Sequence, residues 1–240
     1  MAIINPDLCN GCKVCLMYCP LGVIRMDGEK AVIDQENCVE CYVCSRNRVC
    51  AKGAISPAEI NTKGRTLRHF LSDPTETKAA TGVPGRGTEE SKTNDVTGRV
   101  KQGHLGICID MGRPGVGVWI RDAEKVAMAL AQAGLNFEEA SPLTAILKDR
   151  RTGEIIDEMR NERLLSIIVE GTVPEADFPK VIAALRVVEK EIDTVFSLGV
   201  ISRVDATGRA PFLTQLDGLG LPMPMRGKVN TGLGRPFVND

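Results

Sequence analysis

Regular alternation of apolar and polar residues is confined to the second half of the chain. The segments 105–111 and 164–170 are short apolar runs typical of strands, and a third strand is expected at 195–204. Two stretches between them have helical spacing. Each presents one apolar face, formed by Ala123, Val126, Ala127, Leu130 and Ala131 in the first helix and by Phe178, Val181, Ile182, Leu185 and Val188 in the second.

Capping residues and turns then define the order of these elements. We expect Asp122 to cap the first helix, Gly134 to end it and Pro174 to open the second. The segments 143–147 and 154–159 are candidates for the short strands between the helices. The resulting order, βαββαβ, is a split-βαβ arrangement in which an antiparallel sheet buries one face under two helices. We therefore predict an α+β domain over residues 105–204.

One part of this region also resembles a known class of domain. The stretch 114–137, a PGV turn followed by a helix and AGLNF, is similar to small ligand-sensing domains of the ACT type. This resemblance implies that the domain binds a small molecule, although it brings no ligand-specific residues. The glycines of GRPGVG (112–117) match neither the dinucleotide fingerprint nor a P-loop, so they indicate a tight turn or an anion site at the next helix. Cys108 is interpreted as a small buried thiol, with a reactive or metal-binding thiol as the alternative.

The candidate chemistry lies at the other end of the chain, where eight of the nine cysteines fall within the first 50 residues. Short repeated spacings in a chain without an export signal indicate metal binding rather than disulfides. The first motif reads C-x2-C-x2-C-x3-C-P and the second C-x2-C-x2-C-x5-C, formed by Cys9, Cys12, Cys15 and Cys19 and by Cys38, Cys41, Cys44 and Cys50. Three thiolates spaced by two residues wrap one face of an iron-sulfur cube, and a fourth must come from elsewhere. A zinc site is the alternative, but it needs only four ligands.

The two cysteine motifs belong to an internal repeat. The first triplet recurs 29 positions later, and the short strands AIIN (2–5) and AVID (31–34) recur at the same offset. Residues 1–60 thus resemble the bacterial two-[4Fe-4S] ferredoxins. This resemblance implies two clusters with crossed ligation. Cluster I would be held by Cys9, Cys12, Cys15 and Cys50, and cluster II by Cys38, Cys41, Cys44 and Cys19.

The second motif departs from the family pattern. Five residues instead of three separate Cys44 from Cys50, and Ala51 replaces the usual proline. We expect this insertion to enlarge the loop, with Arg46 and Arg48 adjusting redox properties rather than cluster number. Beside the ligands, Tyr18 and Tyr42 are interpreted as apolar lids over the clusters, with an electron conduit as the alternative.

A polar segment follows the cysteine region. Residues 61–103 hold only eight apolar residues in 43, too few for an independent core. We predict an irregular linker or a partner-docking arm over 61–104. Basic residues favour the arm, because they can make charge-assisted contacts; they include Arg65, Arg68, Arg86 and Arg99. His69 and His104 are expected to be ordinary surface residues.

The C-terminal tail, residues 205–240, combines proline and glycine with many apolar residues. We expect this tail either to pack across its own domain or to wrap a partner subunit in extended conformation. The partner is favoured, because the preceding domain already has its two helices.

Charge and composition exclude several classes of function. Thirty basic and 31 acidic residues give a net charge of −1, and aromatic residues make up only 4%. Neither a general attraction to nucleic acid nor aromatic stacking on bases is therefore expected. No apolar run is long enough for a membrane span. The first residues, MAIINPDLCNG, lack a basic stretch followed by an apolar run, so we expect a cytoplasmic protein.

These observations favour an electron-transfer subunit of a larger, anaerobic-type oxidoreductase, in which a partner supplies the catalytic site. The nearly neutral ferredoxin region, with six basic and seven acidic residues in 1–59, fits a fixed subunit better than a freely diffusing carrier. The alternative is a redox or metabolite sensor with an ACT-like ligand domain. No pattern of catalytic residues is recognisable, so whether the chain is itself an enzyme stays open.

Overall fold

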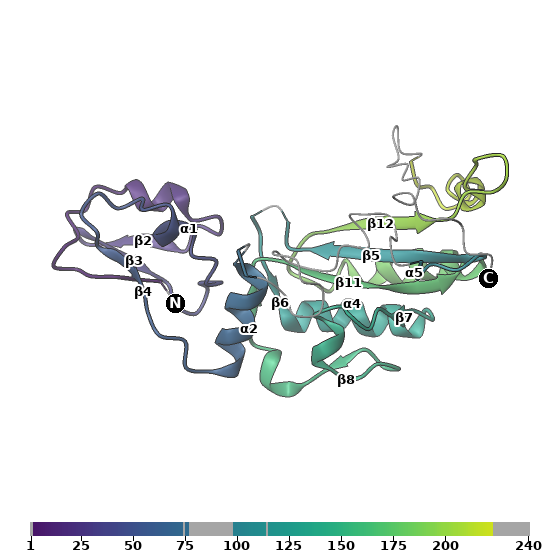
Figure 1. Ribbon diagram of the computed structural model, residues 1–240, viewed down its shortest axis with the longest axis horizontal. Coiled ribbons are helices and arrows are strands. Elements are labelled where there is room, and N and C mark those ends of the chain that lie inside the picture. The colour runs from purple at the N-terminus through teal and green to yellow at the C-terminus, as the bar shows by residue number, and fades with distance from the viewer. Residues whose placement is uncertain (1, 74, 77–97, 114, 223–240) are drawn as a thin grey trace.

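The computed structural model describes residues 2–73, 75–76, 98–113 and 115–222. A small N-terminal domain and a larger mixed domain lie at opposite ends of the molecule, and helix α2 (Lys63–Ser72) lies between them (Figure 1). Within the described ranges no helix has both the length and the apolar character needed to cross a bilayer.

The N-terminal domain is built from two antiparallel strand pairs. Strand β1 pairs with β4, and β2 pairs with β3. Its elements are β1 (Ala2–Ile4), the 3-10 helix η1 (Val14–Tyr18), β2 (Ile24–Asp27), β3 (Lys30–Ile33), α1 (Val43–Arg46) and β4 (Ile55–Pro57). The strands expected at 2–5 and 31–34 are confirmed to within a residue.

The 29-residue repeat is also visible in the backbone. Lys13 precedes η1 in the left-handed conformation, with φ of 65°, and its counterpart Tyr42 precedes α1 with φ of 54°. Gly11, with φ of 71°, corresponds to Glu40, with φ of 56°. Only glycine adopts such angles without strain, so Glu40 is held there by its surroundings.

Helix α2 corrects the expectation of an irregular linker over 61–104. The Thr62 side chain caps it by accepting a hydrogen bond from the Arg65 N–H at 3.2 Å. Leu67, Phe70 and Leu71, at helical spacing, pack against the core of the larger domain. The segment 61–103 has few apolar residues overall, so its composition does not indicate this helix. Three apolar residues on one face are enough to hold a helix when they pack on the core of another domain.

The larger domain is organised around a four-stranded antiparallel sheet with the order β12-β5-β11-β7. Its main elements are β5 (His104–Met111), α4 (Ile120–Gln132), β7 (Asn136–Phe137), β11 (Ile167–Pro174), α5 (Phe178–Val188) and β12 (Phe196–Ser202). Alternate residues of β5, Leu105, Ile107 and Ile109, join the apolar faces of α4 and α5 in one core. The chain therefore has a mixed α+β structure.

The region between α4 and β11 differs from the sequence-based expectation. The short strand β7 follows α4 directly, whereas 143–147 and 154–159 contribute no strand to the main sheet. They form the small pieces η2 (Thr144–Ile146), β8 (Leu147–Asp149), β9 (Glu154–Ile155) and η3 (Asp157–Met159), and a further pair joins β6 (Val118–Trp119) to β10 (Arg163–Leu164). A two-residue strand is too short for its alternation to be recognised in the sequence.

The predicted helix ends are partly correct. Gly134 follows α4 with φ of 91°, as expected for the residue after a helix. Asp122, however, lies in the first turn of α4 and does not cap it, because the helix already begins at Ile120. Pro174 ends β11, and the turn η4 (Glu175–Asp177) separates it from α5.

The described part of the C-terminal tail packs on its own domain. The 3-10 helix η5 (Pro211–Gln215) buries Phe212, whose ring lies 5.8 Å from that of Phe178 in an edge-on arrangement. Leu216 is buried against the same core. Of the two interpretations, packing across its own domain is therefore confirmed for 205–222, and the favoured one, an extended tail around a partner, is wrong there. Residues 223–240 lie outside the described residues.

Replacing Phe178 with alanine is expected to destabilise the larger domain by about 3–5 kcal/mol, because this fully buried ring joins α5, the sheet and η5. Val187→Ala on the same helix is the control. Since Val187 is 61% exposed, its change should stay within about 0.5 kcal/mol. Denaturant unfolding followed by circular dichroism measures both, and equal effects would contradict this description of the core.

Candidate metal centre

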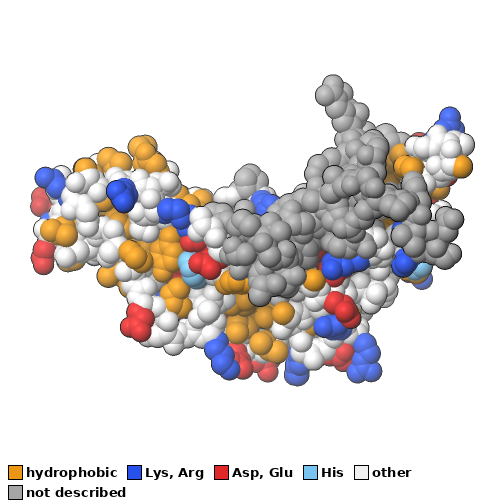
Figure 2. Space-filling model, viewed as in Figure 1, with side chains coloured by type: hydrophobic (Ala, Val, Ile, Leu, Met, Phe, Trp, Pro, Cys, Tyr) orange, Lys and Arg blue, Asp and Glu red, His pale blue; other side chains and the backbone are white. Residues whose placement is uncertain are grey.

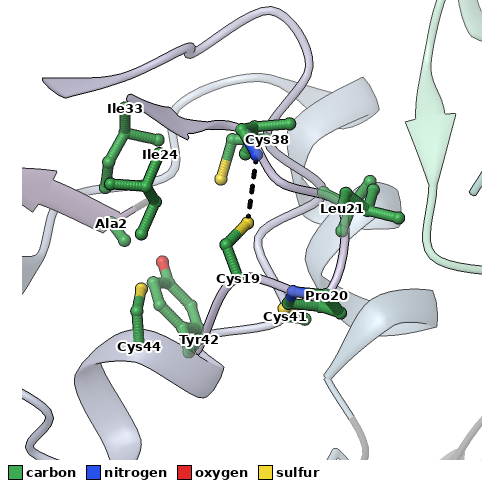
Figure 3. Close-up of a pocket in the computed structure, with 12 residues that line it drawn as sticks. Ala2, Cys19, Pro20, Leu21, Ile24, Ile33, Cys38, Cys41, Tyr42 and Cys44 are labelled. Atoms are coloured by element: carbon green, nitrogen blue, oxygen red, sulfur yellow. Dashed lines mark hydrogen bonds between the residues drawn. The ribbon is translucent and has the colours of Figure 1, made fainter. Parts of the chain in front are cut away.

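Four cysteines from both sequence motifs line a cavity in the N-terminal domain. Cys38, Cys41 and Cys44 come from the second motif, and Cys19 comes from the end of the first. Figure 3 shows their side chains around the cavity, with Tyr42 beside Cys44. The rest of the lining is largely apolar: Ala2, Pro20, Leu21, Val23, Ile24, Ile33 and Val39.

A second cavity has the complementary set of cysteines. Cys9, Cys12 and Cys15 of the first motif line it together with Cys50 of the second. The two additional residues between Cys44 and Cys50 therefore do not remove the Cys50 side chain from the set. The rest of the lining includes Ile4, Ala31, Val49, Ala54 and Ile55.

Backbone N–H groups point at the sulfurs in matching positions of the two halves. The Val23 N–H donates to Cys19 Sγ at 3.3 Å, and the Ala54 N–H donates to Cys50 Sγ at 3.4 Å. The Ala31 N–H approaches Cys9 Sγ at 3.5 Å. Such donors stabilise negative charge on sulfur, as a thiolate ligand requires.

The two cavities differ in burial. Cys38 and Cys41 are buried, whereas Cys12 in the other cavity is exposed. Burial raises the pKa of the Cys38 and Cys41 thiols and raises that of Cys44 to about 12. By contrast, the Ala31 N–H lowers the pKa of Cys9. A cationic metal core would offset the cost of four buried thiolates, so the donor set fits such a group.

Helix α2 lies against the loop that carries the second motif. The Arg65 Nε donates to the Glu40 carboxylate at 2.6 Å, and the Glu40 side chain is fully buried. His69 Nδ1 lies 3.0 Å from the Glu40 carbonyl oxygen, and its ring meets Tyr42 edge-on at 4.8 Å. His69 is therefore part of the interface between the domains and not an ordinary surface residue.

Two arginines reach the carbonyl oxygens of cysteines in the second motif. Arg68 Nη1 donates to the Cys38 carbonyl at 2.8 Å. Arg46 Nη2 donates to the Cys41 carbonyl at 3.2 Å and pairs with Asp73 at the end of α2. The sequence predicted a role for Arg46 near the clusters, but it did not predict that Arg68 contacts the cysteine loop of its own chain. No sequence motif indicates that α2 packs against this loop.

The GRPGVG loop of the larger domain also faces this cavity. A Cβ on Gly115 would lie 3.1 Å from the Pro20 carbonyl oxygen, and one on Gly117 would lie 3.1 Å from Leu21 Cδ1. Pro20 and Leu21 are both lining residues of the Cys19 cavity. The loop closes as a tight turn through the Gly117 N–H to the Gly112 carbonyl at 2.9 Å, which agrees with the turn interpretation.

The remaining candidate residues lie as follows. Tyr42 lines a cavity, whereas Tyr18 is 45% exposed and is not among the lining residues of either one. Cys108 is buried on β5, away from both cavities. His104 Nδ1 lies 3.4 Å from the Gln102 carbonyl oxygen in an exposed position. Arg99 pairs with Glu138 at 2.8 Å, and Arg86 lies outside the described residues.

Within the described ranges, no three His, Cys, Asp or Glu side chains are arranged to hold a single metal ion. The sulfurs instead surround cavities, an arrangement suited to a polynuclear group.

Comparison with known protein families gives a match for the cysteine region. Residues 1–51 match the family model described as a 4Fe-4S dicluster domain. Neither the curated proteins nor the solved structures that were compared match the chain. The matched residues contain all eight cysteines of the two cavities. The N-terminal part of this chain is therefore an iron-sulfur domain of the ferredoxin type.

Proposed function

We propose that the chain binds two [4Fe-4S] clusters and acts as an electron-transfer subunit of a larger oxidoreductase. Each cluster, when bound, supplies a centre that gains or loses one electron at a time. The observation that carries the proposal is the sorting of eight cysteines into two cavities of four, each with members from both motifs. Cys9, Cys12, Cys15 and Cys50 would hold cluster I, and Cys38, Cys41, Cys44 and Cys19 would hold cluster II.

The protein groups around each site have separate tasks in this proposal. The cysteine sulfurs hold iron, and the N–H groups of Val23, Ala31 and Ala54 stabilise sulfur charge. Apolar lining residues exclude water from the sulfurs. Because the fourth cysteine of each set comes from the other motif, the two half-domains hold each other in place.

Cluster I has the more accessible position. Cys12 is exposed, and the neighbouring Met17 and Tyr18 expose 82% and 45% of their surface. Leu8 and Val14 are also exposed. Figure 2 shows apolar side chains on the surface of this end of the molecule. We propose that a partner subunit contacts this apolar surface, defined by Leu8, Val14, Met17 and Tyr18, and exchanges electrons there.

The experiment is anaerobic purification of the complex from native cells. We expect a larger redox chain to co-purify in fixed stoichiometry and to oxidise or reduce the clusters when its substrate is added. Met17→Glu should abolish or strongly weaken the association, because it places a charge in the apolar surface. Val187→Glu, at an exposed valine on α5, is the control and should leave association intact. Recovery of the iron-loaded chain alone would contradict the subunit role and would favour a free carrier or a sensor.

A further inference from the structure

Arg68 on α2 joins the cysteine loop of the second motif to the larger domain. Its guanidinium donates to the Cys38 carbonyl oxygen at 2.8 Å, with longer contacts to the carbonyls of Gln35 and Glu36. On its other side, Nε and Nη2 reach Glu162 Oε2 at 2.8 and 2.6 Å. One side chain thus connects a proposed ligand residue with a carboxylate more than 120 residues further along the chain.

Burial strengthens the electrostatic interactions of the Arg68 guanidinium with its neighbours. Arg68 is only 7% exposed, and the Glu162 side chain is 17% exposed. Charges that are withdrawn from water interact more strongly with their neighbours, because the surroundings screen them less. Close packing supports the pair, since any Cβ on Gly64 of α2 would collide with the Glu162 carboxylate.

At the cavity of cluster I, a lysine rather than an arginine contacts the carbonyl oxygen of a proposed ligand residue. Lys30 Nζ donates to the Cys9 carbonyl oxygen at 2.6 Å. Lys30 lies on β3 within the N-terminal domain, so its position does not depend on the larger domain. In both sites a cationic side chain thus donates to the carbonyl oxygen of a proposed ligand residue. Of these two cations, only Arg68 at cluster II is also paired with a residue of the larger domain.

We propose that Arg68 raises the reduction potential of cluster II and that Glu162 of the larger domain sets the size of this effect. Arg68 is a positioning and tuning residue in this proposal, which rests on the proposed function. Addition of one electron makes the cluster site more negative, and a nearby guanidinium stabilises that state. The Glu162 carboxylate offsets part of the positive charge.

The proposal links the redox properties of cluster II to domain docking. Other charges nearby are paired as well, Arg46 with Asp73 and Arg65 with Glu40. Arg68 is distinct because its acidic partner belongs to the larger domain rather than to α2 or the cysteine loop. Because α2 packs on the core of the larger domain, Arg68 and Glu162 would move together with that domain. A displacement of the domain from the cysteine loop would therefore withdraw Arg68 from the Cys38 carbonyl and would favour the oxidised state.

The test is a redox titration of the full-length, iron-loaded chain followed by electron paramagnetic resonance. Relative to the wild type, R68Q should lower the potential of one cluster by about 59 mV, a tenfold change in its reduced-to-oxidised ratio. E162Q should raise the potential of the same cluster, and R68K should stay close to the wild type because it keeps the charge. K30Q should lower the potential of the other cluster only, which assigns the signals.

The outcomes separate this proposal from the proposed function. Absence of bound clusters in the wild type would contradict the proposed function itself. Two clusters with unchanged potentials in both R68Q and E162Q would overturn the role of Arg68. If both variants shifted the potential in the same direction, Arg68 would act through loop structure instead of charge, and that result also overturns the proposal.

Discussion

Replacing Cys19 with serine is expected to damage the cluster that is built mainly by the second cysteine motif. Cys19 lines the same cavity as Cys38, Cys41 and Cys44, although it lies 19 positions before the first of them. Serine is a poor substitute for a thiolate ligand of iron. Bound iron should fall from about eight to about four atoms per chain, with loss of one of the two paramagnetic signals.

Two further variants make this test specific. Cys50→Ser should damage the cluster at Cys9, Cys12 and Cys15 instead, because Cys50 lines that cavity. Cys108→Ser is the control, since this buried cysteine lies on β5 outside both cavities, and it should keep about eight irons. Crossed ligation would be wrong if Cys19→Ser removed the cluster of its own motif and preserved the other.

Removal of iron is expected to unfold the N-terminal domain while the larger domain stays folded. The apolar cluster of the N-terminal domain has only Cys15, Ile24 and Ala31 as buried members among the described residues. So small a core contributes little stability, and the free energy of metal binding would supply much of the folding free energy of this domain. Hydrogen exchange should accelerate about 100-fold or more in β1–β4, which corresponds to a loss of about 3 kcal/mol.

The larger domain provides the internal control for this measurement. Strands β5 and β11 belong to a separate, extensive core formed with α4 and α5, so their protection should persist after chelation. Exchange in α2 should rise by an intermediate amount, because it packs on the larger domain through Leu71 but loses its contacts with the cysteine loop. Unchanged protection of β1–β4 without iron would contradict the view that the metal groups form the centre of this domain.

The sequence predicted the cysteine site in considerable detail. Residue spacing located the metal-binding region, and the 29-residue repeat anticipated β1 and β3. The family resemblance supplied the pairing of Cys19 with the second motif. The structure places the eight side chains in two groups of the same composition. Local motifs are informative here because the geometry of an iron-sulfur cluster dictates the spacing of its ligands, while the assignment of each cysteine to a cluster stays a prediction.

The contacts between the domains could not be predicted in this way. Arg68, Glu40 and Glu162 have no local pattern that connects them, and the contact of Arg68 with Glu162 spans 94 positions. Similarly, β7 has only two residues, and its place in the sheet depends on pairing with β11. These contacts form only when elements that are distant in the sequence pack together, so they produce no periodic pattern in the sequence.

The tail shows the same limitation. Its apolar residues correctly indicated a buried surface, but the surface that receives Phe212 and Leu216 belongs to this chain. The apolar residues of such a segment indicate that it packs against another surface, but they do not indicate which surface it is.

The most direct test of the central claim is a count of iron and acid-labile sulfide in anaerobically purified full-length protein, combined with paramagnetic resonance of the fully reduced sample. We expect about eight irons and about eight sulfides per chain, with a spectrum from two interacting centres. About four irons with a single isolated signal, or zinc in place of iron and sulfide, would contradict it.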